Sequence, residues 1–210
     1  EIMLQQTQVN TVIAYYQRFM QHFFEVQALA AASLDQVLHC WTGLGYYARA
    51  RNLHKAAQHI CTIYAGELPT DLKQLMDLPG IGRSTAGAIL ALAHGQRYPI
   101  LDGNVKRVLC RYYAIEGWPG DPKIAAQLWQ LAEQQTPTQR VAAYTQAIMD
   151  LGATVCARAQ PHCARCPLRH ECAVHQTGQQ LAYPVPKPRP HKPVKTTVFV
   201  MLQNSQGDIL

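Results

Sequence analysis

Four of the seven cysteines lie within one stretch of seventeen residues, and this cluster constrains the fold more than any other feature of the sequence. They are spaced Cys-x6-Cys-x2-Cys-x5-Cys, at Cys156, Cys163, Cys166 and Cys172. An odd total excludes complete pairing within one chain, and such crowding is more typical of a metal centre than of a secreted disulfide framework. We therefore expect the chain to fold around a metal centre here, in a reducing compartment such as the cytoplasm.

The spacing by itself leaves the metal open. Tetrahedral zinc sites with four cysteines are common, but they usually combine two short turns of the Cys-x2-Cys kind. Only Cys163 and Cys166 form such a turn here. The spacing also differs from the cysteine run of bacterial ferredoxins. Zinc and an iron–sulfur centre are both candidates on these grounds.

Apolar residues recur at helical spacing, and nothing before residue 195 alternates with period two over a useful length. The pattern predicts helices over residues 1–23, 34–41, 71–76, 83–94, 102–115, 122–135 and 138–151, and one that follows a glycine-rich turn and ends near residue 64. No run approaches the ~18 apolar residues of a membrane helix. We therefore expect an all-α body that does not cross a membrane.

A glycine-containing turn between two of these helices is the best candidate for a nucleic-acid contact. Residues 78–86 read LPGIGRSTA, and glycines at 80 and 82 would let backbone N–H groups approach a phosphate. Asp102 stands at the predicted start of a later helix, where its plainest role is that of an N-cap. The net charge of +6 is compatible with a polyanionic partner but does not require one.

The C-terminal stretch differs from the rest in composition. Prolines alternate with basic residues from 184 to 193, so residues 184–195 are expected to form an extended linker. Residues 196–202 (TTVFVML) favour a β-strand, and residues 204–207 favour a turn. A lone hairpin is not stable by itself. Residues 196–210 are therefore expected to begin a further domain, and the helical pattern already under way at Glu1 predicts a preceding segment.

Five segments occur in the order found in the MutY-type adenine DNA glycosylases, a family of the endonuclease-III-like helix–hairpin–helix DNA glycosylase superfamily. They are MLQQTQ (3–8), GLGYYARARNL (43–53), LPGIGRSTAG (78–87), LDGNVKR (101–107) and the four cysteines. The resemblance covers residues 1 to about 183. It implies a six-helix domain with a helix–hairpin–helix (1–97) and a helical [4Fe–4S] domain (98–183) on either side of a DNA cleft. The linker (184–195) and residues 196–210 resemble the start of the family's α/β Nudix-like C-terminal domain.

The resemblance also implies a reaction. Such enzymes flip out adenine that is mispaired with 8-oxoguanine or guanine in double-stranded DNA and remove it by hydrolysis. Glu1 falls on the general acid, Asp102 on the carboxylate that stabilises the oxocarbenium sugar, and Asn104 on a residue that orients it. One protonated and one ionised carboxyl group is the logic of glycoside cleavage. Without the resemblance, Glu1 would be interpreted as a solvated first-turn glutamate.

Other residues acquire roles in the same way. Bifunctional relatives carry a lysine where this chain has Ser84, and because serine cannot form a Schiff base, base removal without strand cleavage is expected. Gln6 and Tyr46 would wedge into the duplex, Gln146 would line the adenine pocket, and Gly80 and Gly82 would contact the DNA backbone. The implied cofactor is a [4Fe–4S] cluster, and a monomer is expected.

Three alternatives are open at this point. The first is a pyrimidine-damage or thymine-mismatch glycosylase, against which Ser84 and the GLGYY segment count. The second is a non-catalytic DNA-binding module, against which the pair Glu1 and Asp102 counts. The third is a zinc-bound structural domain.

Overall fold

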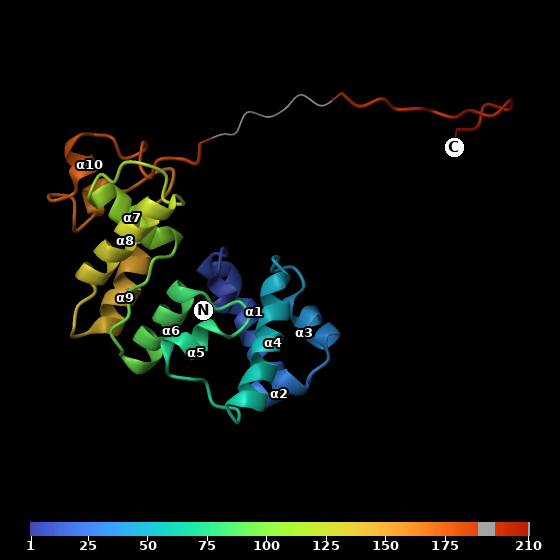
Figure 1. Cartoon of the computed structure of the whole chain (residues 1–210), viewed down its shortest axis with the longest axis horizontal. Coiled ribbons are helices and arrows are strands. Elements are labelled where there is room, and N and C mark those ends of the chain that lie inside the picture. The colour runs from blue at the N-terminus through green and yellow to red at the C-terminus, as the bar shows by residue number, and fades with distance from the viewer. Residues whose placement is uncertain (189–195, 210) are drawn as a thin grey trace.

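The computed structural model describes residues 1–188 and 196–209, and α-helices build the body of the molecule (Figure 1). Within those residues there is no β-strand, which confirms the predicted all-α class. The α-helices are α1 (Val9–His22), α2 (Val26–Ala31), α3 (Leu34–Trp41), α4 (Ala48–Ile63), α5 (Leu72–Met76), α6 (Arg83–His94), α7 (Gly103–Tyr112), α8 (Pro122–Gln135), α9 (Val141–Asp150) and α10 (Ala173–Gln176). No helix among the described residues has both the length and the apolar character needed to cross a membrane.

Helices with strong local start signals have the predicted limits. Ser33 and Gln36 form a capping box at α3, in which the Ser33 hydroxyl accepts a bond from the Gln36 N–H and the Gln36 side chain accepts one from the Ser33 N–H. Asp71 and Asp121 cap α5 and α8 through their carboxylates. These ends were predictable because each depends on residues three positions apart.

The predicted single helix over residues 1–23 is wrong. Its first part is a short 3-10 turn, η1 (Ile2–Leu4), and α1 begins only at Val9. Between them Gln6 has a left-handed backbone, with a φ of 58°. The guanidinium of Arg49 donates hydrogen bonds to the carbonyl groups of Ile2, Met3 and Gln5. A continuous helix would need these carbonyl groups for its own hydrogen bonds. A distant side chain therefore interrupts a locally helical sequence.

Three hydrophobic clusters form the interior. One joins α1, α3 and α4 around the fully buried Trp41, and a second joins α4, α5 and α6 around Leu75 and Leu90. The third connects Ala88 of α6 with α7 and α8, where Leu128 is buried. Helix α6 thus contributes to two clusters, and it also packs against α9. In Figure 1 it lies between the group α1–α4 and the group α7–α9.

The segment that leads into α7 passes very close to α6. A Cβ atom on Gly87 would lie 2.6 Å from the Pro99 carbonyl oxygen. Ile100 and Leu101 are buried in the third cluster. Because α6 presents no side chain at residue 87, the backbone before Asp102 can pack directly on the helix.

Helix α9 passes without interruption into a π-helical turn, η2 (Leu151–Val155), which packs on α7. A Cβ atom on Gly152 would lie 2.5 Å from the Asn104 Cβ atom, so glycine permits this contact. Single π-helical turns of this kind are frequent at functional sites. The turn carries the chain from α9 directly into the cysteine cluster at Cys156.

The expected strand over residues 196–202 is not formed. These residues are exposed and lie apart from the helical body (Figure 1). The expected turn at Asn204–Gly207 is present, and one bridge joins Gln203 to Ile209 across it. A β-rich sequence needs a partner for its backbone groups, and the described residues offer none here. Residues 189–195 of the expected linker lie outside the described residues.

Replacing Gly87 by alanine is expected to destabilise the fold. The new methyl group would meet the backbone carbonyl of Pro99, which cannot move aside as a flexible side chain can. Overpacking of this kind costs about 1–3 kcal/mol, measurable by urea denaturation. Gly103→Ala is the matched control, because a Cβ atom there meets nothing within 4 Å. Equal free energies of unfolding for the two variants would contradict this account.

Candidate active site

The glycine-containing turn joins α5 to α6 as a hairpin. Gly80 has a φ of 82°, and a Cβ atom there would lie 2.8 Å from the Asn52 Cβ atom, so only glycine fits without strain. Gly82 is the exposed N-cap of α6, and its surroundings are open. No side chain caps the start of α6. An uncapped helix start with an open approach is suited to an anion such as a phosphate.

Ser84 is built into the framework of the site. Its hydroxyl oxygen accepts a hydrogen bond of 2.9 Å from the backbone N–H of Leu101. The bond fastens the first turn of α6 to the residue immediately before Asp102. Sequence reasoning had considered Ser84 only as the position of an absent lysine, because the partner is seventeen residues away.

Asp102 begins α7 as its N-cap. One carboxylate oxygen accepts a bond of 2.8 Å from the Val105 N–H, and the side chain is half-buried. The other oxygen accepts no hydrogen bond from the described residues. The predicted N-cap role of Asp102 is therefore confirmed, and it leaves the second carboxylate oxygen able to interact with another group.

Asn104 lies in the first turn of α7 and is connected to the cysteine loop. Its side-chain oxygen accepts a bond of 2.8 Å from Arg107, which also donates to the carbonyls of Gly152 (2.5 Å) and Cys156 (2.7 Å). The Arg107 guanidinium therefore holds Asn104, the beginning of η2 and the first cysteine in one arrangement.

Glu1 lies within electrostatic reach of Asp102. Its residue is exposed as a whole, yet the protein atoms around the carboxyl group raise its pKa above the ordinary 4.5 by desolvation. The Asp102 charge acts in the same direction, and the positive amino terminus opposes it. A bond of 3.2 Å from the Gln5 side chain to the Thr85 hydroxyl holds this end of the chain against α6. Glu1 and Asp102 are thus close enough to influence each other electrostatically.

Gln6 and Tyr46 have their exposure and an unusual backbone conformation in common. Both are exposed, and both have left-handed backbones, with φ values of 58° and 48°. Such conformations cost non-glycine residues on the order of 1–3 kcal/mol each and are concentrated at functional sites. Buried Arg49 contacts the segments that carry both residues. Sequence reasoning missed Arg49, and the only signal was an arginine on the inward face of an otherwise ordinary helix.

Gln146 is not brought to these residues by any described contact. It is exposed on α9, and its amide donates a bond of 2.8 Å to Asp150.

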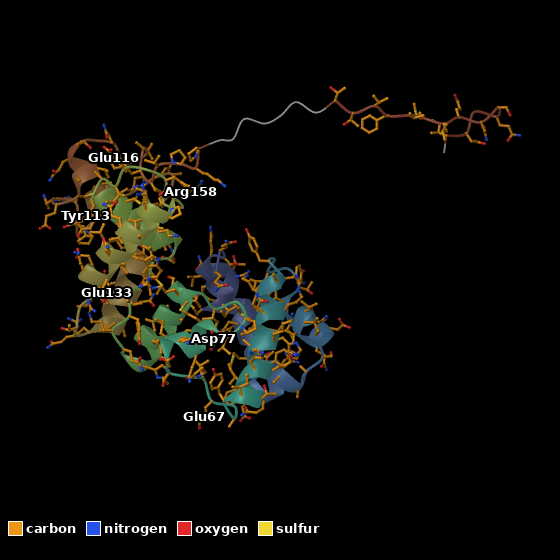
Figure 2. The ribbon with its side chains drawn as sticks, in the orientation of Figure 1. Glu67, Asp77, Tyr113, Glu116, Glu133 and Arg158 are labelled. Carbon is orange, nitrogen blue, oxygen red and sulfur yellow. The ribbon has the colours of Figure 1, made fainter. Side chains whose placement is uncertain are left out.

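An open groove of about 770 Å3 lies between the start of α6 and α8, where the Arg83 guanidinium stacks on Trp129 at 3.9 Å. Glu133, labelled in Figure 2, lines the same groove. Because neither Glu1 nor Asp102 lines it, this groove is not the place where the two carboxyl groups would act.

The four cysteines line one small cavity of about 30 Å3 together with Arg111. All are free thiols, and the Arg111 guanidinium lies 3.4 Å from the Cys156 sulfur. Desolvation by burial, and to a lesser extent the neighbouring thiols, raise the pKa of Cys163 and Cys172. The loop therefore brings together the set that the spacing predicted. Figure 2 labels Arg158, which follows Cys156 in this loop.

The candidate donor set consists of four thiols that line one cavity. Among the described residues, no three His, Cys, Asp or Glu side chains are grouped closely enough to hold one metal ion. Four thiolates can hold either a tetrahedral zinc ion or an iron–sulfur cluster, so the donor types fit both metals that the spacing left open.

Comparisons with known proteins agree with this geometry. The family described as "HhH-GPD superfamily base excision DNA repair protein" matches residues 1–133. An adenine DNA glycosylase of Buchnera aphidicola subsp. Acyrthosiphon pisum is 44% identical over 207 residues, which are 99% of this chain and 59% of the relative. Human adenine DNA glycosylase is 46% identical over 181 residues, 86% of this chain and 33% of the relative. The chain therefore spans between a third and three fifths of the length of these two relatives.

Solved structures show the same fold. A thermostable thymine-DNA glycosylase superposes with a TM-score of 0.75 at 26% identity, covering 84% of this chain and 81% of the other. Endonuclease III in a non-covalent DNA complex gives a TM-score of 0.73 at 24% identity, covering 85% and 82%. The hairpin and the family match over residues 1–133 agree, and the chain belongs to the HhH-GPD superfamily of base excision DNA repair proteins.

Proposed function

We propose that this chain is a monofunctional DNA glycosylase that removes adenine mispaired with 8-oxoguanine or guanine from double-stranded DNA. The observation that carries the proposal is the position of Asp102, which the bond from the Leu101 N–H to the Ser84 hydroxyl holds at the first turn of α6, beside the hairpin. The names of the similar adenine DNA glycosylases support adenine as the base.

The two carboxyl groups would divide the work. Protonated Glu1 donates its proton to a ring nitrogen of adenine, and the electron pair of the N-glycosidic bond leaves with the neutral base. Ionised Asp102 stabilises the positive charge that develops on the sugar, through the oxygen that the Val105 N–H does not occupy. Asn104, held by Arg107, orients this group. Water then adds to the sugar carbon and loses one proton to the Glu1 carboxylate, which restores the acid and leaves an abasic site.

Access to the base requires that adenine leave the helix. The open start of α6 at Gly80 and Gly82 would bind the DNA backbone, which supplies affinity and register but no sequence reading. Gln6 and Tyr46 would fill the space of the extruded base, since unstacking costs a few kcal/mol. Gln146 would join the pocket for the flipped adenine. Ser84 offers no amine, so the reaction stops at base removal.

The four cysteines would hold a [4Fe–4S] cluster. When bound, it would cross-link the loop that follows η2 and so fix the backbone from Cys156 to Cys172. Arg111 would neutralise part of the negative charge of the thiolates. Arg107, which donates to the Gly152 and Cys156 carbonyls and to Asn104, would then hold the Asn104 side chain in a fixed position relative to this loop.

Asp102→Asn is expected to lower the rate of adenine release from an adenine·8-oxoguanine duplex by about a hundredfold or more, because the developing positive charge loses its counter-charge. Asparagine preserves the N-cap. Asp121→Asn, at the N-cap of α8, is the matched control and should keep the parental rate. Single-turnover release should be followed with adenine·thymine duplex as a blank. Release of another base instead, or efficient borohydride trapping of an enzyme–DNA adduct, would overturn the proposal.

The pH dependence should report Glu1. Its raised pKa keeps the acid protonated to higher pH than the ordinary 4.5, so the rate should fall as pH rises through that raised value. Glu1→Gln should remove this limb and lower the rate by about 10²–10⁴-fold. Glu25→Gln, an exposed glutamate without a capping bond, is the control. An unchanged pH profile in Glu1→Gln would assign the proton to another group.

Metal analysis tests the cluster. The purified protein should contain about four irons per chain and absorb broadly in the visible range. Cys156→Ser should lose iron and absorbance, and the backbone around residues 151–176 should lose hydrogen-exchange protection. Cys61→Ser, outside the cluster, should retain both. One zinc per chain without iron would establish the tetrahedral alternative.

A further inference from the structure

Arg49 is a buried cation with no described carboxylate beside it. It lies on α4, only 8% of its surface is exposed, and its Nε atom has no hydrogen-bond partner in the part of the chain that the structure describes. Desolvation lowers the pKa of its guanidinium, although the residue stays charged at neutral pH. Burying a charged group costs free energy unless other contacts compensate, so the contacts of the Arg49 guanidinium should indicate its role.

One group of contacts is to the segment that carries Gln6. Nη1 donates to the carbonyls of Met3 (2.7 Å) and Gln5 (2.5 Å), and Nη2 donates to the Thr7 hydroxyl (2.9 Å). The bonds fall on both sides of Gln6 and none falls on Gln6 itself. The guanidinium therefore fixes the left-handed turn while leaving the Gln6 side chain exposed.

A second group of contacts is to the segment that carries Tyr46. Nη2 also donates to the Gly45 carbonyl (3.3 Å), which accepts a further bond of 3.0 Å from the Trp41 indole. The guanidinium lies over the rings of Trp41 and Tyr46, 5.4 Å from each centroid. Tyr46 is nevertheless 61% exposed. One side chain thus holds two exposed residues that are forty positions apart in the sequence.

We propose that Arg49 is a positioning residue that locks Gln6 and Tyr46 into one rigid clamp, so that both enter the duplex together at the mispair. The inference rests on the proposed function. A pre-ordered clamp avoids paying for loop ordering when DNA binds. Lysine could not replace arginine, because a single ammonium group cannot reach both segments and stack on the rings.

The variants are chosen to separate positioning from stability. Arg49→Met removes every bond of the clamp and keeps much of the volume. Thr7→Val removes one of the Arg49 bonds, together with the weak 3.5 Å bond from the Thr7 hydroxyl to the Gln5 carbonyl, and leaves the other Arg49 contacts in place. Lys55→Met is the control, because it also removes one positive charge from α4 but at an exposed position.

Two readouts are compared in the whole 210-residue chain. The first is the ratio of the affinities for adenine·8-oxoguanine and fully matched duplexes. The second is the fluorescence of 2-aminopurine placed opposite 8-oxoguanine, which rises when that base unstacks. Arg49→Met should lower the affinity ratio about tenfold and Thr7→Val about threefold to fivefold, each with a smaller fluorescence rise. Lys55→Met should match the parent in both.

Three results would overturn the clamp. In the first, Arg49→Met and Thr7→Val fold and keep the parental ratio and fluorescence. In the second, Arg49→Met weakens both duplexes equally with a lower melting temperature, which would make its role purely structural. In the third, Arg49→Met does not fold and Thr7→Val behaves like the parent. Failure of the proposed function is distinguishable, since the parent protein would then release no adenine.

Discussion

The contact between α6 and the backbone of residues 99–101 supports the rest of the candidate site. It depends on the absence of a side chain at Gly87 and on the bond from the Leu101 N–H to the Ser84 hydroxyl. Together they place the start of α7, and therefore Asp102, beside the first turn of α6, where the hairpin would receive DNA. Asp102 is thus positioned by packing and by one hydrogen bond between residues seventeen positions apart.

Three arginines organise the irregular backbone around this contact. Arg49 holds the two segments of the clamp, Arg107 joins Asn104 to η2, and buried Arg111 donates to the carbonyls of Ala157, Arg158 and Tyr183. Helices satisfy their own carbonyl groups, but loops cannot. A planar fork with five donors can satisfy several loop carbonyls at once, and this explains why arginine recurs where the chain is least regular.

The predictable parts of the molecule are those with local causes. The capping residues of α3, α5 and α8 lie within three positions of the N–H groups that they bind, and the cysteine spacing identified a loop that the structure folds around one cavity. The break at Gln6 was not predictable, because its cause is Arg49, more than forty residues away. The bond from the Leu101 N–H to the Ser84 hydroxyl and the electrostatic influence of Asp102 on Glu1 likewise arise only when distant segments pack together. Helix α2, with six residues, is too short for its apolar residues to show helical periodicity.

Helix α6 contributes apolar side chains to two of the three hydrophobic clusters, and this has an evolutionary consequence. Neither group of helices can be duplicated or exchanged alone, because a recombined chain would expose one apolar face of the shared helix to water. Inheritance should therefore keep both groups together as one block, while segments that contribute nothing to those clusters, such as the one after residue 195, are free to be gained, lost or replaced.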